Sequence, residues 1–130
     1  MENVFEYLRN ARVFYLATID GDTPRVRPMA TLVIYDGKIY TIMTTNKKMY
    51  RQLLENSNVE VTAMFGQTWI RLSGKLILDD RKQTVIDLLE DNPQAKQTFG
   101  GNLEMVAPFY FKDVTATINS FTAKPITYTF

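Results

Sequence analysis

The chain has 130 residues, with 15 basic and 14 acidic side chains, no cysteine and no histidine. This length fits one domain, residues 1–130, that can bury a core of its own. The balanced charge argues against non-specific nucleic-acid binding, which needs an excess of Lys and Arg. Without cysteine or histidine, disulfides, thiolate catalysis and a Ser-His-Asp triad are excluded, and we expect no metal site. Any redox chemistry would have to come from a bound organic cofactor.

The predicted elements are short strands with closely spaced turns, interrupted by a few helices. The chain starts with a helix at 2–10, a strand at 13–19 and a turn at 20–22, followed by a strand that carries two arginines. The later elements are strands at 31–35 and 38–44, a helix at 46–56, strands at 59–65 and 69–78, helices at 80–89 and 92–100, and strands at 109–111, 114–121 and 126–130. We expect Gly74 to mark a bend or bulge in its strand, and Asp79 or Asp80 to cap the helix that ends at Leu89. This order predicts a mainly β fold with α-helices, arranged as a closed or nearly closed antiparallel barrel.

The dipeptide Asp36-Gly37 between two apolar runs predicts a tight β-hairpin, because its turn needs positive φ at both central residues. Side chains two residues apart in a strand share a face, so Arg25 and Arg27 point the same way. We expect the strand that carries them to lie beside the strand that ends at Thr44.

The helix after this hairpin begins with Lys47 and Lys48, and Asn46 is its predicted N-cap. Lysine in the first turn opposes the helix dipole unless an anion is bound nearby. One guanidinium, the hydroxyls of Thr44 and Thr45 and these two ammonium groups together suit a phosphate monoester. The alternative is that these charges only solvate a strand edge and a helix start.

Four segments carry a resemblance to a known family: residues 14–21, 24–29, 40–48 and 69–75. In this order, over nearly the whole chain, they resemble the pyridoxamine 5'-phosphate oxidase-like FMN-binding split-barrel family. The likeness is greater to its branch of nitroimidazole-resistance-type proteins. The resemblance implies a six-stranded antiparallel split barrel and a homodimer. It also implies that FMN binds in two clefts between the subunits, with residues of both chains around each flavin.

The resemblance also implies roles for individual residues. The phosphate would be held by the basic and hydroxyl side chains Arg27, Thr44, Thr45, Lys47 and Lys48. The flavin ring would be lined by two segments on neighbouring strands, namely Pro28, Met29 and Ala30, and Thr41, Ile42 and Met43. The partner subunit would contribute Trp69 and Arg71. Judged from pattern alone, the apolar members fit barrel core equally well, Trp69 a packed aromatic and Arg71 a surface ion pair.

The chain also departs from the family pattern. Its last residues, 125–130, lack the Arg-x-His substrate motif of the true oxidase, and Leu32 stands where that enzyme has a lysine for the vitamer phosphate. We therefore expect no vitamin B6 oxidation. The lack of histidine also separates the chain from nitroimidazole-resistance relatives with a histidine near the flavin, and from haem-handling relatives. No catalytic residue is predicted, and Tyr40, Tyr110 and Arg71 are the only candidate proton donors.

We expect an FMN-dependent oxidoreductase that acts on a small planar substrate, with a nicotinamide nucleotide as candidate electron donor. A deazaflavin in place of FMN stays open. One alternative is a flavin-binding carrier or sensor without turnover. Another is an oligonucleotide-binding barrel that uses Arg25, Arg27 and Trp69, which the near-neutral charge disfavours. The N-terminus has no signal-peptide pattern and no segment reaches membrane-spanning length, so we expect a cytoplasmic protein without membrane contact.

Overall fold

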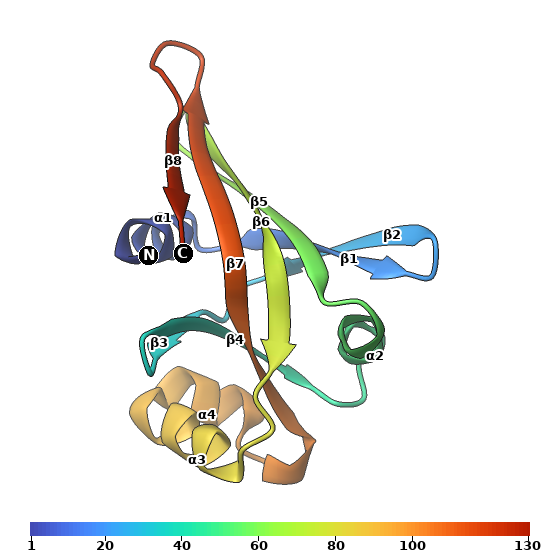
Figure 1. Cartoon of the computed structure of the whole chain (residues 1–130). Helices are drawn as coiled ribbons and strands as arrows, with labels where there is room; N and C mark the ends of the chain where they lie inside the picture. Colours follow the sequence, from blue (N-terminus) through green and yellow to red (C-terminus); the bar gives the residue numbers. More distant parts are fainter.

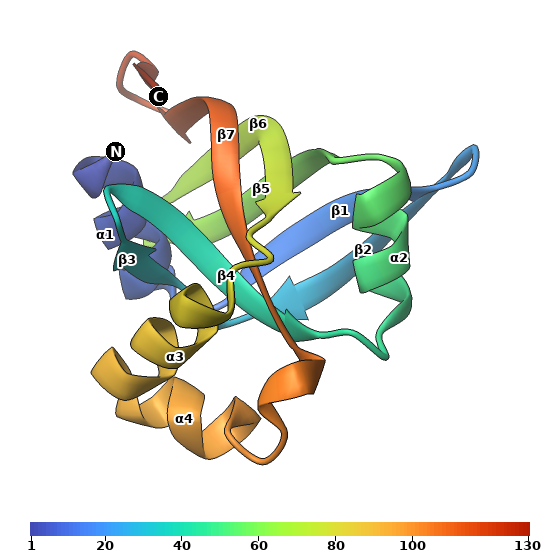
Figure 2. The same ribbon diagram turned by 60° about the horizontal axis from the view of Figure 1, so that its bottom comes forward.

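The computed structural model describes all 130 residues, and its main element is an antiparallel sheet of eight strands (Figure 1). In chain order the elements are α1 (Glu2–Ala11), β1 (Phe14–Asp20), β2 (Thr23–Met29), β3 (Val33–Tyr35), β4 (Lys38–Thr44), α2 (Lys48–Glu55), β5 (Asn58–Phe65), β6 (Thr68–Leu78), α3 (Lys82–Asp91), α4 (Pro93–Phe99), the 3-10 turn η1 (Leu103–Met105), β7 (Val106–Ser120) and β8 (Ile126–Thr129). Figure 2 shows β1, β2, β4, β5, β6 and β7 curving around a common interior. No helix has the length and apolar character needed to cross a membrane.

The strands follow the order β2-β1-β5-β6-β7-β4-β3, and β8 adds to β7. Because the end strands β2 and β3 do not pair with each other, the barrel is open along a seam. The predicted mainly β split-barrel fold is confirmed, with eight strands in place of six. The difference arises because two short strands, β3 of three residues and β8 of four, extend the sheet.

The Asp36-Gly37 hairpin is confirmed. These residues have φ values of 51° and 71°, and Tyr35 pairs with Lys38 across the turn. The expected pairing of the arginine-bearing strand with β4 is wrong. The turn at residues 21–22 returns β2 along the whole of β1, from Asp20 opposite Thr23 to Phe14 opposite Met29, while β4 pairs with β3 and β7.

Strand β2 forms one edge of the sheet and pairs only with β1. It carries Pro24 and Pro28, which have no backbone N–H to donate. Proline is tolerated in a sheet where its nitrogen faces away from a partner strand, so both residues suit an edge position. The seam is therefore bordered by a strand that pairs on one side.

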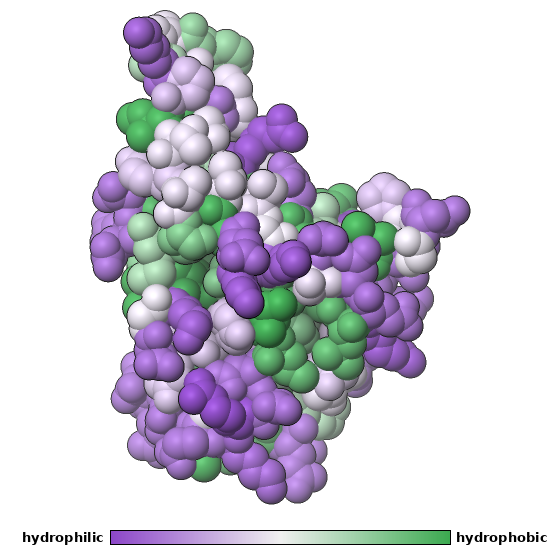
Figure 3. Space-filling view, in the orientation of Figure 1, coloured by the Kyte–Doolittle hydropathy of each residue, from purple (hydrophilic) through white to green (hydrophobic).

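Strand β4 is buried on both faces, because two apolar clusters meet at it. Ile39 and Met43 belong to the main cluster inside the barrel, whereas Tyr40 and Ile42 belong to a smaller one that includes Val85 and residues of α4. The second cluster is closed off by α3 and α4, which lie together below β3 and β4 (Figure 1). The outer surface of this helix pair is mainly hydrophilic, as the lower part of Figure 3 shows.

A bulge interrupts the pairing of β6 with β7. The register shifts between Ser73 and Lys75, and Asp113 on the facing strand has a φ of 54°. The predicted bend at Gly74 is confirmed. A Cβ added to Gly74 would lie 3.1 Å from the carbonyl oxygen of Lys112 and 3.2 Å from a methyl group of Val114.

We expect Gly74→Ala to lower the free energy of unfolding by about 1–3 kcal/mol, because the added methyl group overpacks this bulge. Urea titration measures the change. Gly101→Ala is the matched control, since a Cβ there meets nothing within 4 Å. Equal effects of both substitutions would show that close packing at the bulge is not the cause.

Candidate functional site

A cleft of about 420 Å³ opens where β2, the end of β4, the start of α2 and the end of α4 come together. Most of the residues predicted to bind flavin meet here. The lining consists of Arg27, Pro28, Met29, Ala30, Thr31, Ile42, Met43, Thr44, Lys47, Lys48, Met49 and Phe99. Met29 and Ile42 are also packed against apolar clusters, so their core role and their place beside the cleft are compatible.

Four residues of the predicted set do not line this cleft. The hydroxyl of Thr41 is buried and donates to the carbonyl oxygen of Thr31 at 2.9 Å. The backbone N–H of Thr45 donates to the carbonyl oxygen of Met105 at 2.9 Å. Trp69 and Arg71 lie on β6. Within this single chain, the ring of Trp69 packs 5.1 Å from that of Phe121, and Arg71 lies 3.5 Å from Glu60.

Arg27 is held in the cleft by two buried neutral residues. Its Nη1 donates to Thr18 Oγ1 at 2.7 Å, and its Nη2 donates to Gln52 Oε1 at 2.9 Å. The Thr18 hydroxyl donates to the same Gln52 oxygen at 2.6 Å, which closes a triangle between β1, β2 and α2. The sequence reasoning missed both residues. One signal was available for Gln52, since it lies four residues after Lys48 and thus on the same side of a helix.

The cleft carries unbalanced positive charge. Its lining has no carboxylate, and none of Arg27, Lys47 and Lys48 forms an ion pair. Arg25, in contrast, is exposed and lies 3.2 Å from Asp20. Partial burial lowers the pKa of Arg27 because it removes water from the charged form, yet an arginine keeps its proton under all ordinary conditions. The site therefore suits an anion.

The start of α2 differs slightly from the prediction. The helix begins at Lys48 with Lys47 as its N-cap, and no side chain caps it. Asn46, the expected N-cap, instead accepts a hydrogen bond from the Thr44 hydroxyl at 2.6 Å. Backbone N–H groups of the first turn thus remain free beside the cleft, where they favour negative charge.

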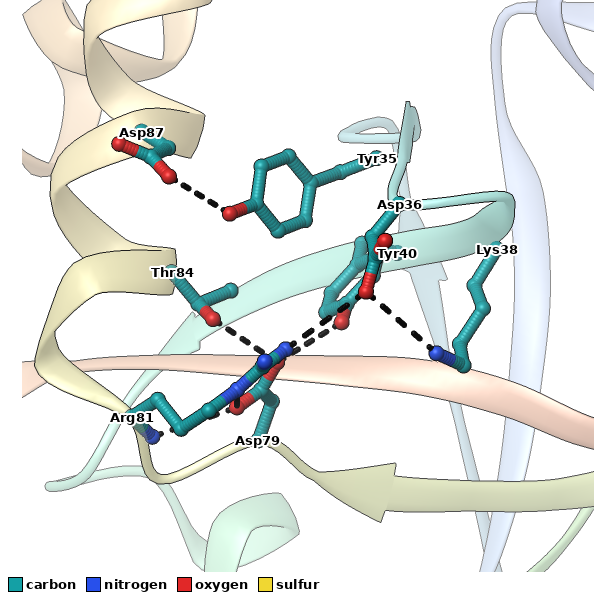
Figure 4. Close-up of polar contacts among 8 residues, drawn as sticks. All are labelled: Tyr35, Asp36, Lys38, Tyr40, Asp79, Arg81, Thr84 and Asp87. Carbon is teal, nitrogen blue, oxygen red and sulfur yellow. Dashed lines mark hydrogen bonds and ion pairs between the residues drawn. The ribbon is translucent and has the colours of Figure 1, made fainter.

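The candidate proton donors do not line the cleft. Tyr40 is fully buried and donates to Asp79 Oδ2 at 2.8 Å (Figure 4). Desolvation, together with this hydrogen bond, raises the pKa of Tyr40 well above its usual value. Tyr110 packs 5.7 Å from the Tyr40 ring and under the ammonium group of Lys38. Tyr40 and Tyr110 therefore belong to the contacts that hold the helix pair α3 and α4 on the sheet.

Asp79 accepts most of the side-chain hydrogen bonds among these contacts. The residue is 6 % exposed, and its carboxylate accepts hydrogen bonds from Tyr40, from the Thr84 hydroxyl at 2.9 Å and from Arg81 at 2.8 and 2.9 Å. The hydrogen bonds from Arg81 contribute most to holding the pKa of Asp79 far below its usual range. The expectation that Asp79 or Asp80 is the N-cap of α3 is wrong, because Arg81 occupies that position.

We expect Tyr40→Phe to lower the free energy of unfolding by about 1–2 kcal/mol, because one buried hydrogen bond to a carboxylate is lost. Flavin affinity should stay unchanged, since the hydroxyl group lies outside the cleft. Thermal unfolding and flavin titration measure the two quantities. A large loss of flavin affinity with little loss of stability would contradict this assignment.

An open antiparallel barrel with a cationic cleft beside its seam defines a split-barrel protein. A sequence model of the family described as pyridoxamine 5'-phosphate oxidase matches residues 1–85. The crystal structure of a NimC/NimA family protein from Clostridium acetobutylicum is 36% identical, with a TM-score of 0.94, over 100% of this chain and 92% of that one. The chain therefore belongs to the pyridoxamine 5'-phosphate oxidase family, in its NimC/NimA-like branch.

More distant structures share the fold. General Stress Protein 26 from Bacillus anthracis is 17% identical, with a TM-score of 0.69, over 98% of this chain and 97% of that chain. A structure described as an F420 reductase is 17% identical, with a TM-score of 0.60, over 82% of this chain and 90% of that chain. No curated protein matches the sequence.

Proposed function

We propose that this protein is an FMN-dependent oxidoreductase that binds the phosphate of its cofactor in the cationic cleft and acts on a small planar substrate. The observation that carries the proposal is the charge of this cleft. Arg27, Lys47 and Lys48 line it without any carboxylate, beside the uncapped first turn of α2. Such a donor set fits a phosphate monoester, which accepts bidentate bonds from arginine and attracts lysine as a point charge.

The remainder of the lining fits the ring of a flavin. Pro28, Met29 and Ala30 form one wall, and Ile42 and Met43 form part of the other. An apolar lining with a few polar groups is typical of cofactor sites, because it excludes water while the polar groups fix orientation. FMN would supply hydride or electron transfer, and the chain would provide binding, orientation and electrostatics.

We also propose that the active form is a homodimer in which Trp69 and Arg71 reach the flavin of the partner subunit. An exposed hollow of about 680 Å³ surrounds Trp69, and seven of its eight lining residues are hydrophobic. Among its neighbours, Met64 is 67% exposed and Phe121 85%. An apolar surface of this kind is typical of an interaction site. Sedimentation analysis should give a dimer, whereas a monomer that still binds FMN would contradict this part.

A flavin-binding carrier without turnover is the second candidate. It is favoured by one observation, namely that the cleft lining contains no tyrosine, aspartate or glutamate to act as general acid. In an oxidoreductase with this lining, the lysine ammonium groups or water would have to supply any proton. The two candidates differ in whether the loaded protein oxidises NADH or NADPH.

The proposal is tested by the visible absorbance spectrum of the purified protein, followed by heat release and chromatography of the ligand against FMN, FAD, riboflavin and a deazaflavin. Release of FMN is expected, and donor and acceptor screens then distinguish enzyme from carrier. Release of a deazaflavin would mean that the cofactor is a deazaflavin and not FMN. A featureless spectrum that added FMN does not change would overturn the proposal.

A further inference from the structure

Arg27 differs from two better exposed arginines in what it contacts. Arg25 and Arg71 each lie against a carboxylate, at 3.2 Å from Asp20 and 3.5 Å from Glu60. Arg27 is less exposed than either, yet it contacts only neutral oxygens. A guanidinium removed from water gains most from a charged partner, so a neutral surrounding calls for an explanation.

The neutral surrounding consists mainly of Gln52 and Thr18. Gln52 is 7% exposed and Thr18 2%, and both direct an oxygen at the guanidinium. The Gln52 oxygen also accepts from Thr18, so each of these three side chains bonds to both of the others. Such a closed arrangement fixes the plane of the guanidinium, because rotation of Arg27 would break two bonds at once.

Arg27 still has donors to spare after these contacts. Its Nη1 also donates to the carbonyl oxygens of Leu16 and Arg25, at 3.3 and 3.4 Å, whereas Nη2 makes one bond and Nε makes none. A guanidinium has five N–H groups. The Nε–H and the second Nη2 hydrogen therefore remain for a ligand, in a cleft with no carboxylate.

We propose that Gln52 is a positioning residue that holds Arg27 with a neutral acceptor, so that the cleft keeps the full charge of Arg27 and prefers a ligand that carries a phosphate. A glutamate at position 52 would have nearly the same shape and would bind Arg27 more strongly. It would also cancel the charge that attracts the phosphate. The inference rests on the proposed function and adds the residue that sets discrimination between FMN and its unphosphorylated form.

The test compares Gln52→Glu with the unmodified protein after removal of bound flavin. Titration with FMN and with riboflavin gives two dissociation constants for each variant. The readout is the dissociation constant of riboflavin divided by that of FMN, which falls when FMN binding alone is weakened. We expect Gln52→Glu to weaken FMN on the order of 10-fold to 100-fold while riboflavin changes less than about 3-fold. The FMN affinity should also depend less on ionic strength, because one net positive charge is lost from the site.

Two further variants separate charge from structure. Gln67→Glu introduces the same charge in the turn between β5 and β6, outside the cleft, and should leave the ratio unchanged. Gln52→Met removes the acceptor without adding charge, so it should lower the ratio less than Gln52→Glu. Thermal unfolding of each variant shows whether its folded state is retained.

The outcomes are distinct. A ratio that falls more for Gln52→Glu than for Gln52→Met, and that stays unchanged for Gln67→Glu, supports the inference. An unchanged ratio, or equal losses of both ligands with lower thermal stability, overturns it while the proposed function stands. Failure of the unmodified protein to bind FMN overturns the proposed function, and this inference with it.

Discussion

Replacing Arg27 and Lys48 together by alanine should weaken FMN binding by on the order of a hundredfold or more, because the two charge-assisted contacts proposed for the phosphate would be lost. Riboflavin lacks the phosphate, so its affinity should change by less than about threefold on the same basis. Fluorescence titration of the flavin-free protein with both ligands measures the two effects.

Arg25→Ala is the control for this double substitution. It removes a guanidinium from the same strand, but from one that is exposed and already bound to Asp20 outside the cleft. Both affinities should remain close to those of the unmodified protein. If the double substitution weakened FMN and riboflavin equally, the assignment of the cationic end of the cleft to the phosphate would be wrong.

Asp79→Ala should cause a large loss of stability, about 2–5 kcal/mol, because it leaves two buried hydroxyl groups without an acceptor. Tyr40 is 0% exposed and Thr84 1%, and both donate to this carboxylate. Chemical denaturation at neutral pH measures the change. Asp80→Ala is the matched control, since the neighbouring aspartate is exposed and makes no side-chain hydrogen bond or ion pair.

The contribution of Asp79 should depend on pH in a defined direction. Its folded-state pKa lies well below its unfolded value, which is about 4. The stabilisation is therefore complete above about pH 5 and decreases as the pH falls below the unfolded value toward the folded one. The difference in stability between Asp79→Ala and the unmodified protein should narrow below about pH 4. A difference that stays constant down to acid unfolding would contradict the role of the ionised carboxylate.

Local signals in the sequence are sufficient to predict the hairpin and the bulge. Asp36-Gly37 and Gly74 act through the backbone conformation of a few neighbouring residues, so their meaning does not depend on distant partners. The cleft residues were found because two short segments, 27–30 and 42–48, carry most of it. That these two segments lie together could be expected only from the family resemblance, because the strand order of the sheet is not a local property of the sequence.

The roles of Tyr40 and Gln52 could not be predicted from the sequence, because they depend on contacts with residues far away in the chain. Strand β4 is buried on both faces, so it lacks the usual alternation of apolar and polar residues. The sequence therefore does not show to which face of the sheet Tyr40 points. Its hydroxyl therefore fitted a proton donor in the cleft as well as a partner of Asp79. Gln52 looks like an ordinary polar residue of an amphipathic helix, because its spacing from Lys48 places it on the side of the cleft but does not indicate that β1 and β2 cover it.

The two prolines of β2 have a consequence for how copies of this chain meet. An unpaired strand edge is a template on which another chain can add a strand, and this is a common start of aggregation. Pro24, Val26 and Pro28 lie two residues apart along the strand, so their backbone nitrogens face the same way. Because proline has no N–H to donate to a neighbouring strand, these nitrogens face away from β1. Only Val26 can then donate from that stretch. The open barrel thus leaves its seam accessible to a small ligand while offering a poor surface for strand addition.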